Sequence, residues 1–192
     1  MKLNDKKIRD ALIFKLITAS KTPYTIIEEH GVERGKALAD VVAVYKHTHC
    51  FEIKSDLDSL SRLKRQIVFY DRSFQKISIV VTAKYLSVVG EYIPEHWGVM
   101  EAYTNKGSVC IRYVRGAKCN KNISVDAVLK GMWKSELENI YECLSLNPMS
   151  KSASKDKLIL GLENISREKI LTVCTQLLRT RNERKFSMMN SK

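Results

Sequence analysis

Three charged side chains near the start of the chain could together hold a divalent cation against a phosphodiester. Asp40 lies inside the apolar run LADVVAV, and Glu52 and Lys54 follow with only Ile53 between them. Carboxylate and carbonyl oxygens are ligands that Mg²⁺ prefers, and a nearby lysine can orient bound water or neutralise charge on a phosphate. These residues predict a Mg²⁺ (or Mn²⁺) site, with Asp40, Glu52 and the Ile53 carbonyl as ligands and Lys54 as a catalytic group.

Two neighbouring strands are expected to position these residues. Residues 37–45 and 49–54 are apolar, β-branched runs joined by a short polar turn, which predicts an antiparallel hairpin. Because side chains alternate across a strand, Glu52 and Lys54 share one face, and hairpin counting places Asp40 across from them. The alternative is that all three are ordinary solvated strand-end charges. That alternative does not explain an aspartate inside an apolar run, where a charge needs a partner or a metal.

The other elements of the first 115 residues predict a mixed α/β fold, a sheet flanked by helices. Apolar residues at helical spacing predict three helices, over residues 6–19, 57–74 and 85–93. Thr22 and Pro23 are expected to end the first, and Asp56 or Asp58 to cap the second. Further strands are predicted over residues 24–28, 77–83, 97–103 and 108–114, the last two as a hairpin.

Beyond Gly116 the pattern becomes helical. Helices are predicted over residues 125–130, 133–146, 157–161 and 166–181. The last residues, from Arg179, are basic and are expected to fray. We therefore divide the chain into an α/β core, residues 1–115, and a helical C-terminal extension, residues 116–192.

Composition and charge narrow the function classes. The 192 residues are 44% hydrophobic and 28% charged, which is typical of a globular chain rather than a disordered one. A formal net charge of +12 favours a polyanionic partner, and we expect nucleic acid, with DNA first, rather than a membrane. Five widely spaced cysteines without a C-x-x-C motif favour free thiols in the cytoplasm. A homodimer or a partner protein remains open.

The order Asp40, then Glu52-Ile53-Lys54, then Gln66 and Tyr70 resembles the PD-(D/E)XK nuclease superfamily. The string EIKSDLDSLSRL, with this glutamine and tyrosine downstream, is similar to one small standalone bacterial and phage branch of mostly uncharacterised proteins. The resemblance implies a restriction-endonuclease-like fold and a magnesium-dependent deoxyribonuclease. Such a hydrolase would cut DNA phosphodiester bonds, with endonucleolytic or exonucleolytic cutting left open.

The resemblance also implies roles for further residues. Gln66 would position water or substrate, and Glu29 would complete the metal site, with Glu28 as its competitor. Apart from the resemblance, the basic residues Arg62, Lys64 and Arg65 are candidates for substrate contact, because the 57–74 helix begins beside the site. Tyr70 is a further candidate, because it lies one turn after Gln66 on the same face. For the three basic ones, a solvated helix face is the alternative.

Two other function classes remain open. One is a catalytically silent nucleic-acid-binding module on the same fold. The other is a protein-interaction module, such as a phage-encoded regulator or inhibitor, whose charge competes for nucleic acid. Salt-sensitive DNA binding without a partner separates the first class from the second.

Overall fold

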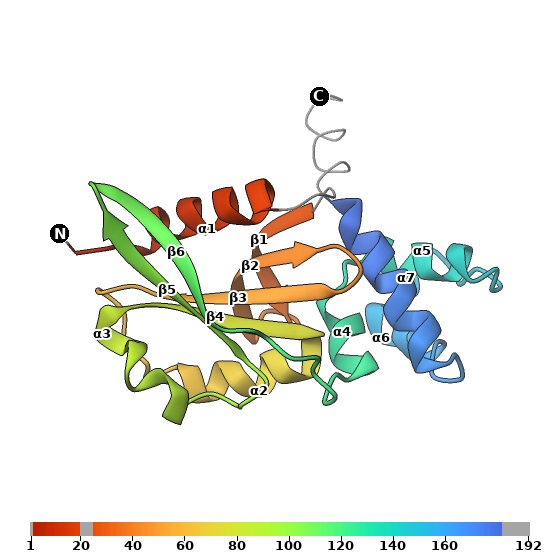
Figure 1. Cartoon of the computed structure of the whole chain (residues 1–192). Coiled ribbons are helices and arrows are strands. Elements are labelled where there is room, and N and C mark those ends of the chain that lie inside the picture. Colours follow the sequence, from red (N-terminus) through yellow and green to blue (C-terminus); the bar gives the residue numbers. More distant parts are fainter. Residues whose placement is uncertain (1, 20–24, 182–192) are drawn as a thin grey trace.

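A six-stranded mixed sheet forms the centre of the computed structural model, which describes residues 2–19 and 25–181 (Figure 1). The strands lie in chain order and are β1 (Thr25–Val32), β2 (Ala37–Val44), β3 (Thr48–Lys54), β4 (Lys76–Thr82), β5 (Gly98–Asn105) and β6 (Ser108–Arg115). β4 is parallel to both of its neighbours, and the other pairs are antiparallel. The predicted α/β class with a mixed sheet is therefore confirmed.

Helices cover both faces of this sheet. The N-terminal ones are α1 (Asp5–Ala19), α2 (Leu63–Ser73), α3 (Ala83–Leu86) and a 3₁₀ turn, η1 (Val89–Glu91). The C-terminal ones are α4 (Val125–Gly131), α5 (Lys134–Cys143), α6 (Lys155–Leu160) and α7 (Arg167–Arg179). In Figure 1, α1 and α2 lie on opposite faces, and α4 to α7 gather at the end of the sheet where β2 turns into β3.

Two apolar layers follow from the alternation of side chains along the strands. On one face, Val41, Phe51 and Ile53 pack with Leu12 of α1. On the other face, strand residues pack with α2 and with the C-terminal helices in one continuous cluster that includes Val42, Cys50, Tyr70, Leu137 and Ile170. The division of the chain after residue 115 stays a prediction, and the two parts share this apolar layer.

Two predicted helices differ from the structure. The helix expected from residue 57 begins only at Leu63, because the expected caps bind elsewhere. The Asp56 carboxylate accepts from Leu3 N–H at 2.8 Å, and Asp58 accepts from Ser55 N–H at 2.9 Å. The helix expected over residues 85–93 is broken into α3 and η1, in a segment where adjacent valines precede Gly90, all weak helix formers. The expected stop at Thr22 and Pro23 and the C-terminal residues from 182 lie outside the described part.

A buried ionic cluster joins the last helix to the edge of the sheet. Arg181 donates to both carboxylate oxygens of Glu136, at 2.8 and 2.6 Å, and its third nitrogen lies 2.8 Å from His30 Nδ1. All three residues are less than 9% exposed. Because an arginine nitrogen only donates, Nδ1 of His30 must accept, and His30 is neutral in this arrangement.

This neutral histidine predicts acid sensitivity. Burial, and then the Arg181 charge, lower the pKa of His30 from 6.5 to about 3. The unfolded chain therefore binds a proton below about pH 6.5 that the folded chain does not, and stability is lost as the pH falls. We expect His30→Asn to reduce the slope of the free energy of unfolding against pH by about 1.4 kcal/mol per pH unit. Urea unfolding between about pH 7 and pH 5 measures the slope, and an unchanged slope contradicts a neutral His30.

All five cysteines are free thiols. Within the described residues, none of the helices is both long and apolar enough to cross a bilayer.

Candidate functional site

Glu52 and Lys54 point from β3 toward α2 and contact each other. Glu52 is 2% exposed and Lys54 is 3% exposed. Lys54 Nζ lies 2.5 Å from Glu52 Oε1 and donates a second hydrogen bond to Gln66 Oε1 at 3.1 Å. The predicted shared face of these two strand residues is therefore present, and the lysine charge is neutralised inside the protein.

Two side chains of α2 complete the shell around the Glu52 carboxylate. Gln66 Nε2 donates to Glu52 Oε1 at 2.7 Å, and the Tyr70 hydroxyl lies 2.7 Å from both Glu52 Oε2 and the Leu38 carbonyl oxygen. Burial, and then the Glu52 charge, raise the pKa of Tyr70, so its hydroxyl keeps its proton. Tyr70 is buried and holds Glu52 in place. A residue that contacts substrate is expected to be exposed, so the location of Tyr70 differs from the predicted one.

Asp40 lies at the other wall of the same cleft. Its Oδ2 accepts the Ile53 N–H at 2.7 Å, so the carboxylate satisfies the strand backbone where the β2–β3 pairing ends. Its Oδ1 lies 3.7 Å from an Arg9 nitrogen. Burial, and then the Glu52 charge, raise the pKa of Asp40 from 3.8 to about 7. The structure therefore brings Asp40, Glu52 and Lys54 together, as hairpin counting predicted.

Arg9 of α1 is a central residue that sequence reasoning missed. Its guanidinium lies 2.9 Å from Asp5, 3.3 Å from Glu29 and 3.7 Å from Glu28, in addition to its approach to Asp40. Glu29 is exposed, has a positive φ of 52° and does not line the cleft with Glu52. The only sequence signal for Arg9 is its i,i+4 spacing from Asp5, which many surface helices share.

The cleft beside these residues has a volume of about 450 Å³. Its lining contains Asp40, Glu52, Lys54 and Gln66, together with the exposed Arg62 just before α2 and Arg65 in its first turn. Lys64 is also exposed, but it does not line the cleft. Of the predicted substrate contacts, the structure therefore gathers Arg62 and Arg65 at the cleft and leaves Lys64 outside it.

The cleft offers few oxygen donors for the predicted metal ion. Asp40 and Glu52 supply two carboxylates, and each already accepts internal hydrogen bonds. Among residues 2–19 and 25–181, no group of three or more His, Cys, Asp or Glu side chains is placed to hold a metal ion. The donors suit an ion that keeps most of its water shell, since Mg²⁺ is often bound through only one or two carboxylates.

Comparisons with known proteins point away from the nuclease superfamily. The family described as "Bacteriophage P4 protein cII" matches residues 1–192. "Protein cII" of Enterobacteria phage P4 is 29% identical over 169 residues, which cover 88% of this chain and 64% of that protein. The chain thus spans less than two thirds of this relative's length. No solved structure matches, so the restriction-endonuclease-like form of the fold is not confirmed.

The assignment to the PD-(D/E)XK superfamily is therefore wrong, and so is the identification as a magnesium-dependent deoxyribonuclease and hydrolase. The finding that overturns both is a match of the whole chain to a different family. The physical reason is that a short D…E-x-K pattern also arises when Asp40 satisfies a strand end and Glu52 and Lys54 neutralise each other. By the match over all 192 residues, the chain belongs to the bacteriophage P4 protein cII family.

Proposed function

We propose that this protein is a phage regulatory protein that binds nucleic acid, with DNA as the first candidate, and does not hydrolyse it. The observation that carries the proposal is the internal neutralisation of Lys54. Its ammonium group lies between Glu52 and Gln66 and is 3% exposed, so it is held by the protein itself. A lysine held in this way has little freedom to act on a phosphate, whereas the rim of the cleft can still bind one.

Two arginines at the rim of the cleft support binding. Arg62 and Arg65 are exposed and line the cleft, and within the described residues neither guanidinium has an ion-pair or hydrogen-bond partner. An arginine guanidinium can bind two phosphate oxygens at once through a bidentate pair of hydrogen bonds. Lys36 stands on the β1–β2 turn of the same cleft, where Glu33 lies 3.7 Å from it. Phosphate contacts of this kind position a nucleic acid without reading its sequence.

Mg²⁺ is proposed as an ion that Asp40 and Glu52 hold through its bound waters. Asp40 and Glu52 face one cleft, and a divalent cation between them would add positive charge where a phosphate backbone passes. The Ile53 carbonyl remains the third proposed ligand, and Glu29 would have to leave Arg9 to become a fourth. A rise in thermal stability with Mg²⁺ that is absent in Asp40→Asn supports this site.

The cellular compartment and the protein partners are also part of the proposal. Five free cysteines fit the cytoplasm, where thiols stay reduced. A homodimer or a partner protein of the host or phage remains a prediction.

The test is DNA binding by the double variant Arg62→Ala/Arg65→Ala. We expect about a tenfold loss of affinity at moderate salt, and a salt dependence of log K that is shallower by about 1.8, since two phosphate contacts are lost on duplex DNA. Fluorescence anisotropy with labelled single-stranded and duplex DNA measures both quantities.

Lys64→Ala is the control for position, because it removes one positive charge from the same helix outside the cleft. Its affinity should stay within about twofold of the unmodified protein. Equal affinity of the double variant and the unmodified protein would rule out the cleft as the interface. DNA recovered from the binding reaction in shortened form would overturn binding without hydrolysis. Absence of any salt-sensitive binding would favour the protein-interaction class instead.

A further inference from the structure

A second, more basic groove lies at the opposite end of β3 from Lys54. It runs between the β2–β3 turn and α7, which lie side by side in Figure 1, and has a volume of about 580 Å³. Its lining includes four charged residues, Lys46, Arg167, Glu168 and Arg179, together with Tyr45 and Gln75. Three cations against one carboxylate distinguish this groove from the cleft beside Asp40, where acidic and basic groups are balanced.

The three cations have no carboxylate within ion-pair distance among the described residues. Lys46, Arg167 and Arg179 are all exposed. The Arg179 guanidinium and the Lys46 ammonium each lie 6.0 Å from the centre of the Tyr45 ring. Arg167 donates to the Ile123 carbonyl at 3.0 Å, which fixes its direction without neutralising its charge. The groove therefore keeps its positive potential.

Two nearby histidines add no charge to this end of the molecule. Burial, followed by the charges of Lys76 and Lys46, lowers the pKa of His47. Burial, followed by Lys76, lowers the pKa of His49 to about 3. Both imidazoles are therefore neutral near pH 7, and the positive charge of this end of the molecule comes from lysine and arginine, which keep their charge over the physiological range.

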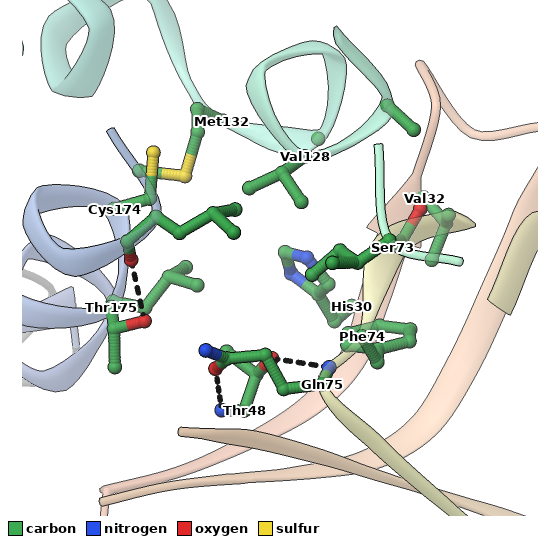
Figure 2. Close-up of a pocket in the computed structure, with 15 residues that line it drawn as sticks. His30, Val32, Thr48, Ser73, Phe74, Gln75, Val128, Met132, Cys174 and Thr175 are labelled. Carbon is green, nitrogen blue, oxygen red and sulfur yellow. Dashed lines mark hydrogen bonds between the residues drawn. The ribbon is translucent and has the colours of Figure 1, made fainter. Parts of the chain in front are cut away.

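A rigid neutral donor completes the groove. Gln75 Oε1 accepts the Thr48 N–H at 2.8 Å, and Gln75 N–H donates to Thr48 Oγ1 at 3.3 Å (Figure 2). Since Oε1 is occupied, the amide nitrogen of this side chain is left to donate elsewhere. The pocket of Figure 2, which Gln75 also lines, has a volume of only about 20 Å³, which is room for one water and not for a ligand. A ligand that contacts Gln75 would therefore have to lie in the open groove.

We propose that this groove is a second binding site for the phosphodiester backbone of a nucleic acid, separate from the cleft beside Asp40. Lys46 and Arg179 would contact phosphates from the two walls, Arg167 from the start of α7, and Gln75 would donate from the floor. Cations spread along an open groove suit several successive phosphates better than one free anion. The proposal shares with the proposed function the assumption that nucleic acid is the partner.

The experiment compares two double variants. Lys46→Ala/Arg179→Ala removes two groove cations and leaves Arg167, whose bond to Ile123 supports the fold. Lys118→Ala/Lys157→Ala makes the same change of net charge at exposed positions outside the groove. We expect the groove variant to lose about tenfold in DNA affinity and to have a salt slope shallower by about 1.4 to 1.8, with the control variant within about twofold.

The outcomes separate the two sites. An equal loss of DNA affinity in the groove and control variants means that only net charge matters, and it overturns the proposal that the groove is a binding site. Competition with a mononucleotide tests the backbone assignment. If a mononucleotide displaces labelled DNA as effectively as an unlabelled DNA strand does, the assignment to a phosphodiester backbone is overturned. Loss in the groove variant with no loss in Arg62→Ala/Arg65→Ala supports the groove and contradicts the cleft. The reverse result contradicts the groove and leaves the proposed function intact.

Discussion

Replacing Arg181 by alanine is expected to lower the free energy of unfolding by about 3–5 kcal/mol, because it removes the cation that pairs with a buried carboxylate and leaves that carboxylate only the Trp133 N–H as a donor. Glu136 is 1% exposed and receives two hydrogen bonds from this one guanidinium. The same group lies 4.5 Å from the centre of the Trp133 ring, so packing is lost as well as charge. Urea unfolding followed by tryptophan fluorescence measures the loss, since Trp97 is fully buried in the sheet layer.

Lys6→Ala is the matched control for this prediction. Lys6 lies 2.9 Å from Asp10 one turn along α1, but the two side chains are 81% and 63% exposed. An exposed pair of this kind is worth about 0.3–0.5 kcal/mol. The double change Arg181→Leu/Glu136→Leu should be less damaging than Arg181→Ala, because it removes both charges together. A loss below about 1 kcal/mol in Arg181→Ala contradicts the importance of this pair.

Replacing Lys54 by methionine is expected to cost about 2–4 kcal/mol. The change keeps most of the side-chain volume and removes the ammonium that lies 2.5 Å from the buried Glu52 carboxylate. Gln66 and Tyr70 still donate to that carboxylate, which keeps the cost below that of a fully abandoned charge. Chemical unfolding measures the cost, and Glu52→Gln/Lys54→Met should recover most of it.

The same variants also test the proposed function. Because Glu52 and Lys54 neutralise each other inside the protein, the charge-neutral double variant Glu52→Gln/Lys54→Met should bind DNA within about twofold of the unmodified protein. Binding is measured below the unfolding transition of each variant. A large loss of affinity in the folded double variant would mean that the lysine reaches the nucleic acid, contrary to its burial. Lys54→Met alone should bind more weakly than the double variant, because its unpaired Glu52 carboxylate repels phosphate.

Local patterns in the sequence determined the strands and the face that the central residues share. The apolar runs at 37–45 and 49–54 formed the expected hairpin, because β-branched runs around a short polar turn pair with their nearest neighbour. Alternation along β3 placed Glu52 and Lys54 together, since that relation depends only on a spacing of two residues. The +12 charge is likewise a property of composition alone.

The same local reasoning was wrong about the family, because three short-range residue types do not distinguish a catalytic site from a satisfied internal network. Only the tertiary structure shows that Tyr70 and Gln66 enclose the Glu52 carboxylate and that Arg9 of α1 draws Glu29 away from the cleft. These contacts depend on how helices pack on the sheet, and no spacing in the sequence encodes that packing directly.

The largest gap between sequence and structure lies in contacts between distant parts of the chain. Arg181 contacts His30 across 151 positions and Glu136 across 45, and α7 forms a groove with a turn that precedes it by more than a hundred residues. Propensity and periodicity act over a few residues, so the sequence by itself determined the elements and the overall charge. Burial of the apolar faces of α4 to α7 against the sheet decided which charges meet, and therefore where the basic groove lies.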